Sequence, residues 1–282
     1  MGGMATRCCV AMSVRQAESM ATQRRVAMPP GRAPVRLEAR GRAAGLLTRR
    51  ADSERSGMSS ARDWAVVLAS GGMDSCTVIA WAARRWRLAL LHVNYGQRTE
   101  AKELECFERL VAHFRPERHL AVEAAYLSRI GGSSLTDDRI PVPEDETPGL
   151  IPSTYVPFRN ANLLAIATSW AETLGATHIA IGAVEQDAPG YPDCRPAFYE
   201  AAARLIELGT RPDTHIAIET PLISLRKADV IRLGCELGAP FELTWSCYQS
   251  ENRPCRNCAS CKRREEAFQE AGKIDPLLAR QA

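Results

Sequence analysis

The sequence predicts an α/β fold in which helices cover both faces of a parallel β-sheet. Short apolar runs alternate with longer segments whose apolar residues have helical spacing, the order expected of repeated strand–helix–strand units. The strand-like runs are apolar without interruption, as in sheets that are buried on both faces. A cluster of four cysteines near the C-terminus predicts an additional small metal-binding segment.

The first predicted strand, Trp64–Ala69, is apolar, too short for a helix, and followed by Gly71 and Gly72. After it we expect a helix over residues 77–85, a strand over 88–93, a helix over 99–114 and a strand over 120–122. Residues 128–158 are rich in proline and glycine and predict a loop. Loops of that length in a compact domain often have a function.

The alternation continues in the second half of the chain. We expect a helix over residues 160–174, a strand over 178–182, a helix over 196–208, a strand over 215–218 and a helix over 227–237. Gly238 follows the last of these helices, where a glycine commonly ends a helix. No apolar run approaches the ~20 residues that a membrane helix needs, so we expect no membrane partner.

Charge divides the chain into two unlike parts. Residues 1–57 contain 11 Arg, no Lys and 4 acidic residues, a net charge of +7. Their Arg, Ala, Gly and Pro content predicts disorder. A transit peptide and a start codon placed ahead of Met58 are the two explanations that fit, and we favour the start codon. The other 225 residues carry 25 basic and 29 acidic groups, which argues against a nucleic-acid partner.

The segment Ser70-Gly-Gly-Met-Asp-Ser75 lies between the first predicted strand and the first predicted helix. In a parallel sheet this is the carboxyl edge, where ligands bind. Gly71 and Gly72 allow a sharp turn, and its N–H groups and the helix N-terminus attract phosphate oxygens. Asp74 would repel phosphate without a cation between them, so we expect Mg²⁺ there. The alternative is a glycine-rich turn with a serine cap, and the Gly-Lys-Ser/Thr of a Walker P-loop is absent.

Cys247, Cys255, Cys258 and Cys261 form a C-x7-C-x2-C-x2-C cluster. Four thiolates complete a tetrahedral site without an open position, so we expect one structural Zn²⁺ per chain. The alternative is an iron–sulfur cluster, although the fourth Cys-Pro of ferredoxin-type runs is missing. Free thiolates in a large chain predict a cytoplasmic protein. We thus expect an extension over 1–57, a nucleotide-binding α/β domain over 58–240 and a zinc-binding region over 241–282.

Several motifs together resemble a known enzyme family. The segment Ser70–Ser75 is similar to the PP-loop of ATP pyrophosphatases, which transfer AMP and release pyrophosphate. From about Ala65 to Arg264 the chain resembles the 7-cyano-7-deazaguanine synthase family of queuosine biosynthesis. The motifs that carry this resemblance occur in order and are Val67–Ser75, Asn94–Arg98, Ser133–Thr136, Val156–Asn160, Gly190–Pro196, Thr220–Leu222, Lys227–Asp229, Thr244–Tyr248 and the cysteine cluster. Gly190–Pro196 is highly specific, and the 1–57 extension departs from the family.

The resemblance implies a Rossmann-like α/β fold of the PP-loop ATPase type and a ligase activity. The expected enzyme combines 7-carboxy-7-deazaguanine and ammonia, with consumption of ATP, into the nitrile 7-cyano-7-deazaguanine. Adenylylation of the carboxylate supplies a leaving group, ammonia then gives an amide, and activation of the amide oxygen allows loss of water. Position 2 is Gly and not the Cys of a glutaminase, so free ammonia is expected. A homodimer is also implied.

The same resemblance assigns roles to single residues. ATP is expected at Leu68, Ala69, Ser70, Gly71, Gly72, Met73, Asp74, Ser75, Cys76, Thr77 and Val78. Asp74, Lys227 and Arg159 are expected to be catalytic. Lys227 would neutralise the leaving pyrophosphate, and Arg159 would pair with a carboxylate or phosphate; a solvated helix-end lysine and a structural ion pair are the respective alternatives. Substrate contacts are expected from Tyr95, Arg98, Asp187, Tyr191, Asp193 and Arg195, with a core role as the alternative for the aromatic residues.

Two other functions fit parts of the sequence. A PP-loop tRNA-modifying sulfurtransferase would use the cysteines for iron–sulfur or persulfide chemistry, but it needs a basic face that the acidic body does not favour. A zinc-ribbon nucleic-acid binder without enzymatic activity would leave Ser70–Ser75 and Gly190–Pro196 without a use. We therefore favour the ligase.

Overall fold

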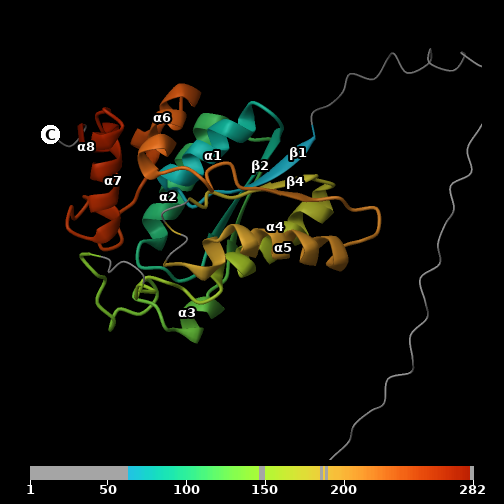
Figure 1. Ribbon diagram of the computed structural model, residues 1–282, viewed down its shortest axis with the longest axis horizontal. Helices are drawn as coiled ribbons and strands as arrows, with labels where there is room; N and C mark the ends of the chain where they lie inside the picture. Colours follow the sequence, from blue (N-terminus) through green and yellow to red (C-terminus); the bar gives the residue numbers. More distant parts are fainter. Residues whose placement is uncertain (1–62, 146–149, 185–186, 188–189, 280–282) are drawn as a thin grey trace, which may run out of the picture. The chain divides into compact units, whose positions relative to one another are not determined.

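A parallel five-stranded sheet in the order β3-β2-β1-β4-β5 forms the centre of the fold (Figure 1). The computed structural model describes residues 63–145, 150–184, 187 and 190–279. Every neighbouring pair of strands is parallel, which confirms the predicted α/β class. The strands are β1 (Trp64–Leu68), β2 (Arg87–Asn94), β3 (Arg118–Glu123), β4 (His178–Ala180) and β5 (Ala217–Glu219).

The helices alternate with the strands along most of the chain. All the predicted strands and helices are present, and with one exception their ends lie within two residues of the expected positions. Gly238 ends α6 with a φ of +76°, as predicted. The helices are α1 (Met73–Ala83), α2 (Glu100–Phe114), α3 (Tyr126–Ile130), α4 (Arg159–Leu174), α5 (Pro196–Gly209), α6 (Lys227–Leu237), α7 (Ala259–Glu270) and α8 (Pro276–Ala279).

Successive residues of β1 face the two helical layers in turn. Val66 and Leu68 belong to the core that includes α4 and α5, whereas Ala65 and Val67 belong to the core that includes α1, α2 and α6. Figure 1 shows α4 and α5 on one side of the sheet and α1 and α6 on the other. Both faces of the strand must therefore be apolar, which explains the absence of polar alternation in its sequence.

The start of α1 is the exception among the predicted ends. The helix begins at Met73 and not at residue 77, because Gly72 is extended (φ −85°, ψ 169°) and the helical turn follows it directly. Asp74 and Ser75 therefore lie in the first turn of α1 and not in a loop. Side chains in this position project from the end of the helix at which the backbone N–H groups are unpaired.

Three helices lie where the sequence predicted none: α3, α7 and α8. Helix α3 overlaps the start of the predicted loop 128–158, and the described residues after it contain no further helix or strand before α4. Helix α7 lacks a clear apolar stripe because charged residues surround it, and even Arg264 is among its buried residues. Apolar spacing therefore could not reveal this helix.

Three further expectations concern membrane helices, residues 1–57 and the boundary at residue 240. None of the helices in the described ranges is long and apolar enough to cross a membrane. The predicted disorder of residues 1–57 lies outside the described residues. The predicted boundary at residue 240 stays a prediction, although Ile231 of α6 packs with Ala267 and Phe268 of α7 across it.

A close contact joins α1, α6 and the segment that precedes the cysteines. A Cβ atom added to Gly234 of α6 would lie 2.3 Å from the Phe241 ring and 2.8 Å from Oγ1 of Thr77 in α1. Both distances are shorter than van der Waals contact, so only glycine fits without a shift of its neighbours. The packing of α6 on α1 depends on this missing side chain.

We expect Gly234→Val to lower the free energy of unfolding by about 1–3 kcal/mol, because the added methyl groups overpack the α1–α6 contact. The control is Gly209→Val at the end of α5, where an added Cβ meets no atom within 4 Å. Urea unfolding measures both. Equal stability of the two variants would contradict the predicted overpacking.

Candidate active site and metal centre

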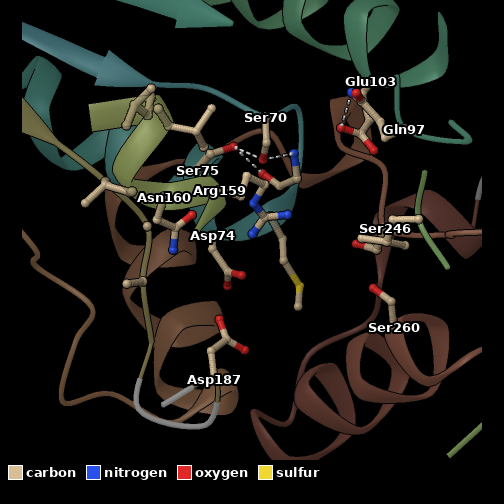
Figure 2. Close-up of a pocket in the computed structure, with 18 of the residues that line it drawn as sticks. Ser70, Asp74, Ser75, Gln97, Glu103, Arg159, Asn160, Asp187, Ser246 and Ser260 are labelled. Carbon is tan, nitrogen blue, oxygen red and sulfur yellow. Dashed lines mark hydrogen bonds between the residues drawn. The ribbon is translucent and has the colours of Figure 1, made fainter. Parts of the chain in front are cut away.

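The carboxyl ends of β1, β2 and β4 open into a cavity of about 260 Å³ (Figure 2). Residues just beyond these strands line it, among them Ala69, Tyr95 and Ile181. In the order β3-β2-β1-β4-β5, the direction of winding reverses between β1 and β4. Open α/β sheets bind ligands at this reversal, so the cavity is the candidate active site.

The segment Ser70–Ser75 forms a hydrogen-bonded turn at the edge of the cavity. Oγ of Ser70 donates to Oγ of Ser75 at 3.2 Å and accepts from the N–H of Gly72 at 3.3 Å. Oγ of Ser75 donates to the carbonyl of Gly72 at 3.0 Å. Gly71 has a φ of +82°, and a Cβ there would lie 2.7 Å from the carbonyl oxygen of Glu103. Backbone conformation and packing therefore both require glycine at this position.

Most residues predicted to hold ATP line the cavity. These are Leu68, Ala69, Ser70, Gly72, Met73, Asp74 and Ser75. The other four are not among the lining residues: Gly71 packs against α2, and Cys76, Thr77 and Val78 are buried in the core behind the turn. The turn and the first residues of α1 thus form the surface that a nucleotide would meet.

Three charged side chains meet at the centre of the cavity. Nζ of Lys227 donates to Oδ2 of Asp74 at 2.6 Å and lies 3.8 Å from Oδ1 of Asp187. Figure 2 shows the carboxylates of Asp74 and Asp187 pointing toward one another. Burial opposes the charge of Lys227, but the two carboxylates outweigh it and raise the pKa of the ammonium above its usual value. Burial also raises the pKa of Asp187, against the effect of Lys227.

One oxygen of Asp74 is left over from this arrangement. Oδ1 is buried and has no hydrogen-bond partner in the described part of the chain. A buried carboxylate oxygen without a partner is unfavourable unless a ligand supplies one. Carboxylate oxygens are preferred ligands of Mg²⁺, so Asp74 fits the cation predicted there.

Arg159 lies at the start of α4 and lines the cavity. Nη1 of Arg159 donates to Oη of Tyr95 at 3.2 Å, and its guanidinium lies 5.6 Å from the centre of the Tyr95 ring. Burial raises the pKa of Tyr95, so the phenol stays neutral and accepts from the guanidinium. A cation held over a neutral ring is available to a second, anionic partner in the cavity.

The other predicted substrate contacts divide into two groups. Tyr191 and Arg98 line the cavity. Oη of Tyr191 lies 2.6 Å from Oγ1 of Thr154, and Arg98 donates to three backbone carbonyls of residues 134–140, which fixes the long loop. Asp193 and Arg195 are not among the lining residues. Oδ2 of buried Asp193 accepts from the backbone N–H of Asn160 at 2.8 Å, so the carboxylate supports the first turn of α4.

The structure adds cavity residues that the sequence did not single out. They include Gln97, Glu103, Asn160, Ser246, Tyr248 and Ser260. Four of them lie inside motifs that carry the family resemblance, although nothing in the sequence singled out these side chains within the motifs: Gln97, Asn160, Ser246 and Tyr248. Glu103 and Ser260 are placed by helices α2 and α7, and no sequence motif marked them.

Three basic residues follow the cysteine cluster, and the structure separates them. Lys262 pairs with Asp145 at 2.8 Å on the surface, and Arg264 is buried against Asp275 at 2.7 Å. Arg263 lines the cavity, where Asp74 acts on it electrostatically. Helix α7 therefore delivers one positive charge to the candidate active site.

The four predicted metal ligands converge on one point. The Sγ atoms of Cys247, Cys255, Cys258 and Cys261 all lie within 4.8 Å of one another. The N–H groups of Gln249 and Cys255 donate to Sγ of Cys247 at 3.4 Å, and the N–H of Cys258 donates to Sγ of Cys255 at 3.3 Å. Such donors stabilise thiolates, so the donor set fits a metal ion.

The metal centre and the cavity share elements. Cys258 is the N-cap of α7, so the cluster also defines where that helix begins. Cys247 and its neighbours Ser246 and Tyr248 line the cavity, as do Ser260 and Arg263 of α7. Figure 2 shows Ser246 and Ser260 on one wall, apart from Asp74 and Asp187. Loss of the metal would therefore disturb one wall of the cavity.

Solved structures with a similar fold have low sequence identity to the chain. The NMN synthetase from Francisella tularensis is 13% identical, with a TM-score of 0.43 over 76% of this chain and 79% of that one. The NH3-dependent NAD synthetase from Campylobacter jejuni is 15% identical, with a TM-score of 0.39 over 79% of this chain and 83% of that one.

Comparison with characterised families gives a closer match. Residues 64–272 match the family model of queuosine biosynthesis protein QueC. The 7-cyano-7-deazaguanine synthase of Chlorobium limicola is 56% identical over 76% of this chain and 95% of its own length. The enzyme of the same name from Acidobacterium capsulatum is 53% identical over 78% of this chain and 98% of its own length. The matched region contains both the cavity and the cysteine cluster, and the chain belongs to the family of queuosine biosynthesis protein QueC.

Proposed function

We propose that this chain is an ATP-dependent ligase that converts 7-carboxy-7-deazaguanine and ammonia into 7-cyano-7-deazaguanine, for queuosine biosynthesis. The names of its relatives support the product. The observation that carries the proposal is the pairing of Asp74 with Lys227 beside the Ser70–Ser75 turn, inside one cavity. This places an anion-binding turn and a fixed cation where an acid substrate and a triphosphate would meet.

The first half of the reaction transfers AMP to the carboxylate. The N–H groups of the turn and the N-terminus of α1 bind phosphate oxygens, and Lys227 neutralises charge on the departing pyrophosphate. Asp74 and Asp187 would hold Mg²⁺, which when bound screens the phosphate charge. Arg159 and Arg263 lie in the same cavity and bind the remaining anionic groups.

The second half replaces AMP by nitrogen. Ammonia attacks the activated carbonyl and AMP leaves, which gives the amide. A second adenylylation, at the amide oxygen, makes that oxygen a leaving group, and its departure with AMP gives the nitrile. The residues of the cavity hold the flat heterocycle and the nucleotide in contact, and positioning of this kind can account for a large part of a rate enhancement.

The cysteine centre has a structural role in this proposal. We propose one Zn²⁺ per chain, because four sulfur ligands fill a tetrahedral ion and leave no position for a substrate. Free thiolates fit the cytoplasm, and we propose that the enzyme acts there, as a homodimer. The names of the relatives do not favour the sulfurtransferase alternative.

The purified chain should form the nitrile from ATP, an ammonium salt and 7-carboxy-7-deazaguanine, with release of pyrophosphate and AMP. Mass spectrometry of the product, with and without each substrate, measures this. A folded, metal-loaded sample that forms neither nitrile nor amide would contradict the proposed activity.

Asp74→Asn should lower the rate of pyrophosphate release by roughly 10²–10³-fold, because it removes the carboxylate that fixes Lys227 and would ligate Mg²⁺ beside the transferring phosphate. Asp187 remains near Lys227, so we expect the variant to fold, and thermal unfolding checks this. The matched control is Asp213→Asn, in an exposed loop before β5. A wild-type rate in the Asp74 variant would exclude a role for this carboxylate.

Removal of the metal with a chelator should abolish nitrile formation, because the start of α7 carries Ser260 and Arg263 into the cavity. Elemental analysis should give one zinc per chain, and re-addition of zinc should restore activity. Cys255→Ser should lose the metal, whereas Cys235→Ser, at an exposed cysteine outside the cluster, should keep it. Iron together with visible absorption would instead support an iron–sulfur cluster.

A further inference from the structure

The proposed reaction sets a requirement for proton removal. Ammonia carries three hydrogens and the nitrile nitrogen carries none, so one proton must leave during amide formation and two during dehydration. Ammonium, the main form in neutral water, adds a fourth. A base near the position of the nitrogen is therefore needed in both halves of the reaction. The need for such a base rests on the proposed function.

Among the residues that the structure describes, three carboxylates line the cavity and could accept these protons: Asp74, Asp187 and Glu103. Asp74 and Asp187 lie 2.6 Å and 3.8 Å from Nζ of Lys227, on the side of the cavity that we propose for the phosphates and Mg²⁺. Figure 2 shows Glu103 on a different part of the wall, apart from both of them. Of these three described carboxylates, Glu103 is the one that lies away from the proposed phosphate side.

The surroundings of Glu103 fix its position without neutralising it. Oε1 accepts from Oγ1 of Thr99 at 2.9 Å and Oε2 accepts from Nε2 of Gln97 at 3.1 Å. Both donors are uncharged. Gln97 is itself held, because its Oε1 accepts from the backbone N–H of Tyr95 at 2.9 Å. A carboxylate fixed in this way on the cavity wall is oriented before any substrate binds.

The charges around Glu103 come from several elements. Arg159 of α4 favours the ionised carboxylate and so lowers the pKa of Glu103. Glu100, which lies on α2 with Glu103, opposes its ionisation. Tyr95, before α2, and Cys106, one turn further along α2, are the other titratable groups that interact with it. Burial outweighs the hydrogen bonds and Arg159, and raises the pKa of Glu103 to about 7.

We propose that Glu103 is the general base that accepts the protons of the reacting nitrogen. In amide formation, the C–N bond forms as ammonia adds to the adenylylated carbonyl. Glu103 takes one proton from the adduct nitrogen, and the C–O bond to AMP breaks with its electron pair on AMP. In dehydration, two protons leave the nitrogen of the adenylylated amide through Glu103. The second C–O bond to AMP then breaks, and water receives each proton from Glu103.

A pKa near neutral pH suits this carboxylate to repeated proton transfer. Above its pKa the side chain is the base form that the reaction needs, and below it the protonated form accumulates and the rate falls. A base with a pKa near the working pH also gives the proton up readily to water between steps. An unperturbed glutamate would be ionised but a weaker acceptor.

The test uses the full-length, metal-loaded chain and compares two reactions. Exchange of labelled pyrophosphate into ATP, dependent on 7-carboxy-7-deazaguanine, reports adenylylation without nitrogen chemistry. Nitrile formation reports the whole sequence. For Glu103→Gln we expect exchange within about threefold of wild type and a loss of roughly 10²–10⁴-fold in nitrile formation, the usual contribution of a general base. Glu108→Gln, at an exposed position of the same helix, is the matched control.

The pH profile separates a base from a structural residue. With free ammonia held constant by adjusting total ammonium, wild-type nitrile formation should fall to half near pH 7 as the solution is acidified. Glu103→Gln should lose this dependence, and Glu103→Asp, which keeps a carboxylate, should recover part of the rate with a shifted half-point.

Each outcome decides a different question. If wild type shows no substrate-dependent exchange, the proposed function itself fails. If wild type is active in both reactions and Glu103→Gln keeps its nitrile rate, only the role of Glu103 is overturned. An equal loss of exchange and nitrile formation in Glu103→Gln also overturns it, because the side chain would then support the site as a whole and not the nitrogen chemistry.

Discussion

The buried pairing of Lys227 with Asp74 is the constraint on which the site depends. Lys227 begins α6 and Asp74 lies in the first turn of α1, so one 2.6 Å contact joins the starts of two helices that are far apart in sequence. A buried charge is tolerated only with a partner. Without Asp74, Lys227 would keep Asp187 at 3.8 Å but would lose this shorter ion pair. The pairing therefore holds the phosphate-facing wall in one arrangement before any ligand binds.

The two walls of the cavity differ in their electrostatics. The wall that carries Asp74, Asp187 and Lys227 concentrates charge, and we propose that it binds the triphosphate. Glu103, by contrast, accepts hydrogen bonds from the uncharged side chains of Gln97 and Thr99. The cysteine centre determines where α7 begins and so places Ser260 and Arg263, which gives it an effect on the site without a part in the reaction. In the proposed reaction, the first wall would bind the anion and Glu103 would accept protons from the amine.

The sequence revealed the sheet, the turn and the cysteine cluster, because each depends on local spacing. Uninterrupted apolar runs identified the strands, and the closely spaced cysteines identified the cluster. The start of α1 was misplaced because Gly72 ends the extended segment without a polar cap. Helix α7 was missed because its buried side includes Arg264, and Glu103 was missed because only tertiary packing brings α2 to the cavity. Asp193 was a reasonable choice by chemistry, but its carboxylate is used by the backbone of α4.

The central claim is that the Ser70–Ser75 turn binds the triphosphate, with the ion pair between its own Asp74 and Lys227 beside the phosphates. A crystal structure with Mg²⁺ and a non-hydrolysable ATP analogue tests it most directly. The account predicts phosphate oxygens on the N–H groups of the turn, and a cation at the Oδ1 atom of Asp74 that now lacks a partner. An empty turn with the triphosphate bound elsewhere in the protein would contradict it.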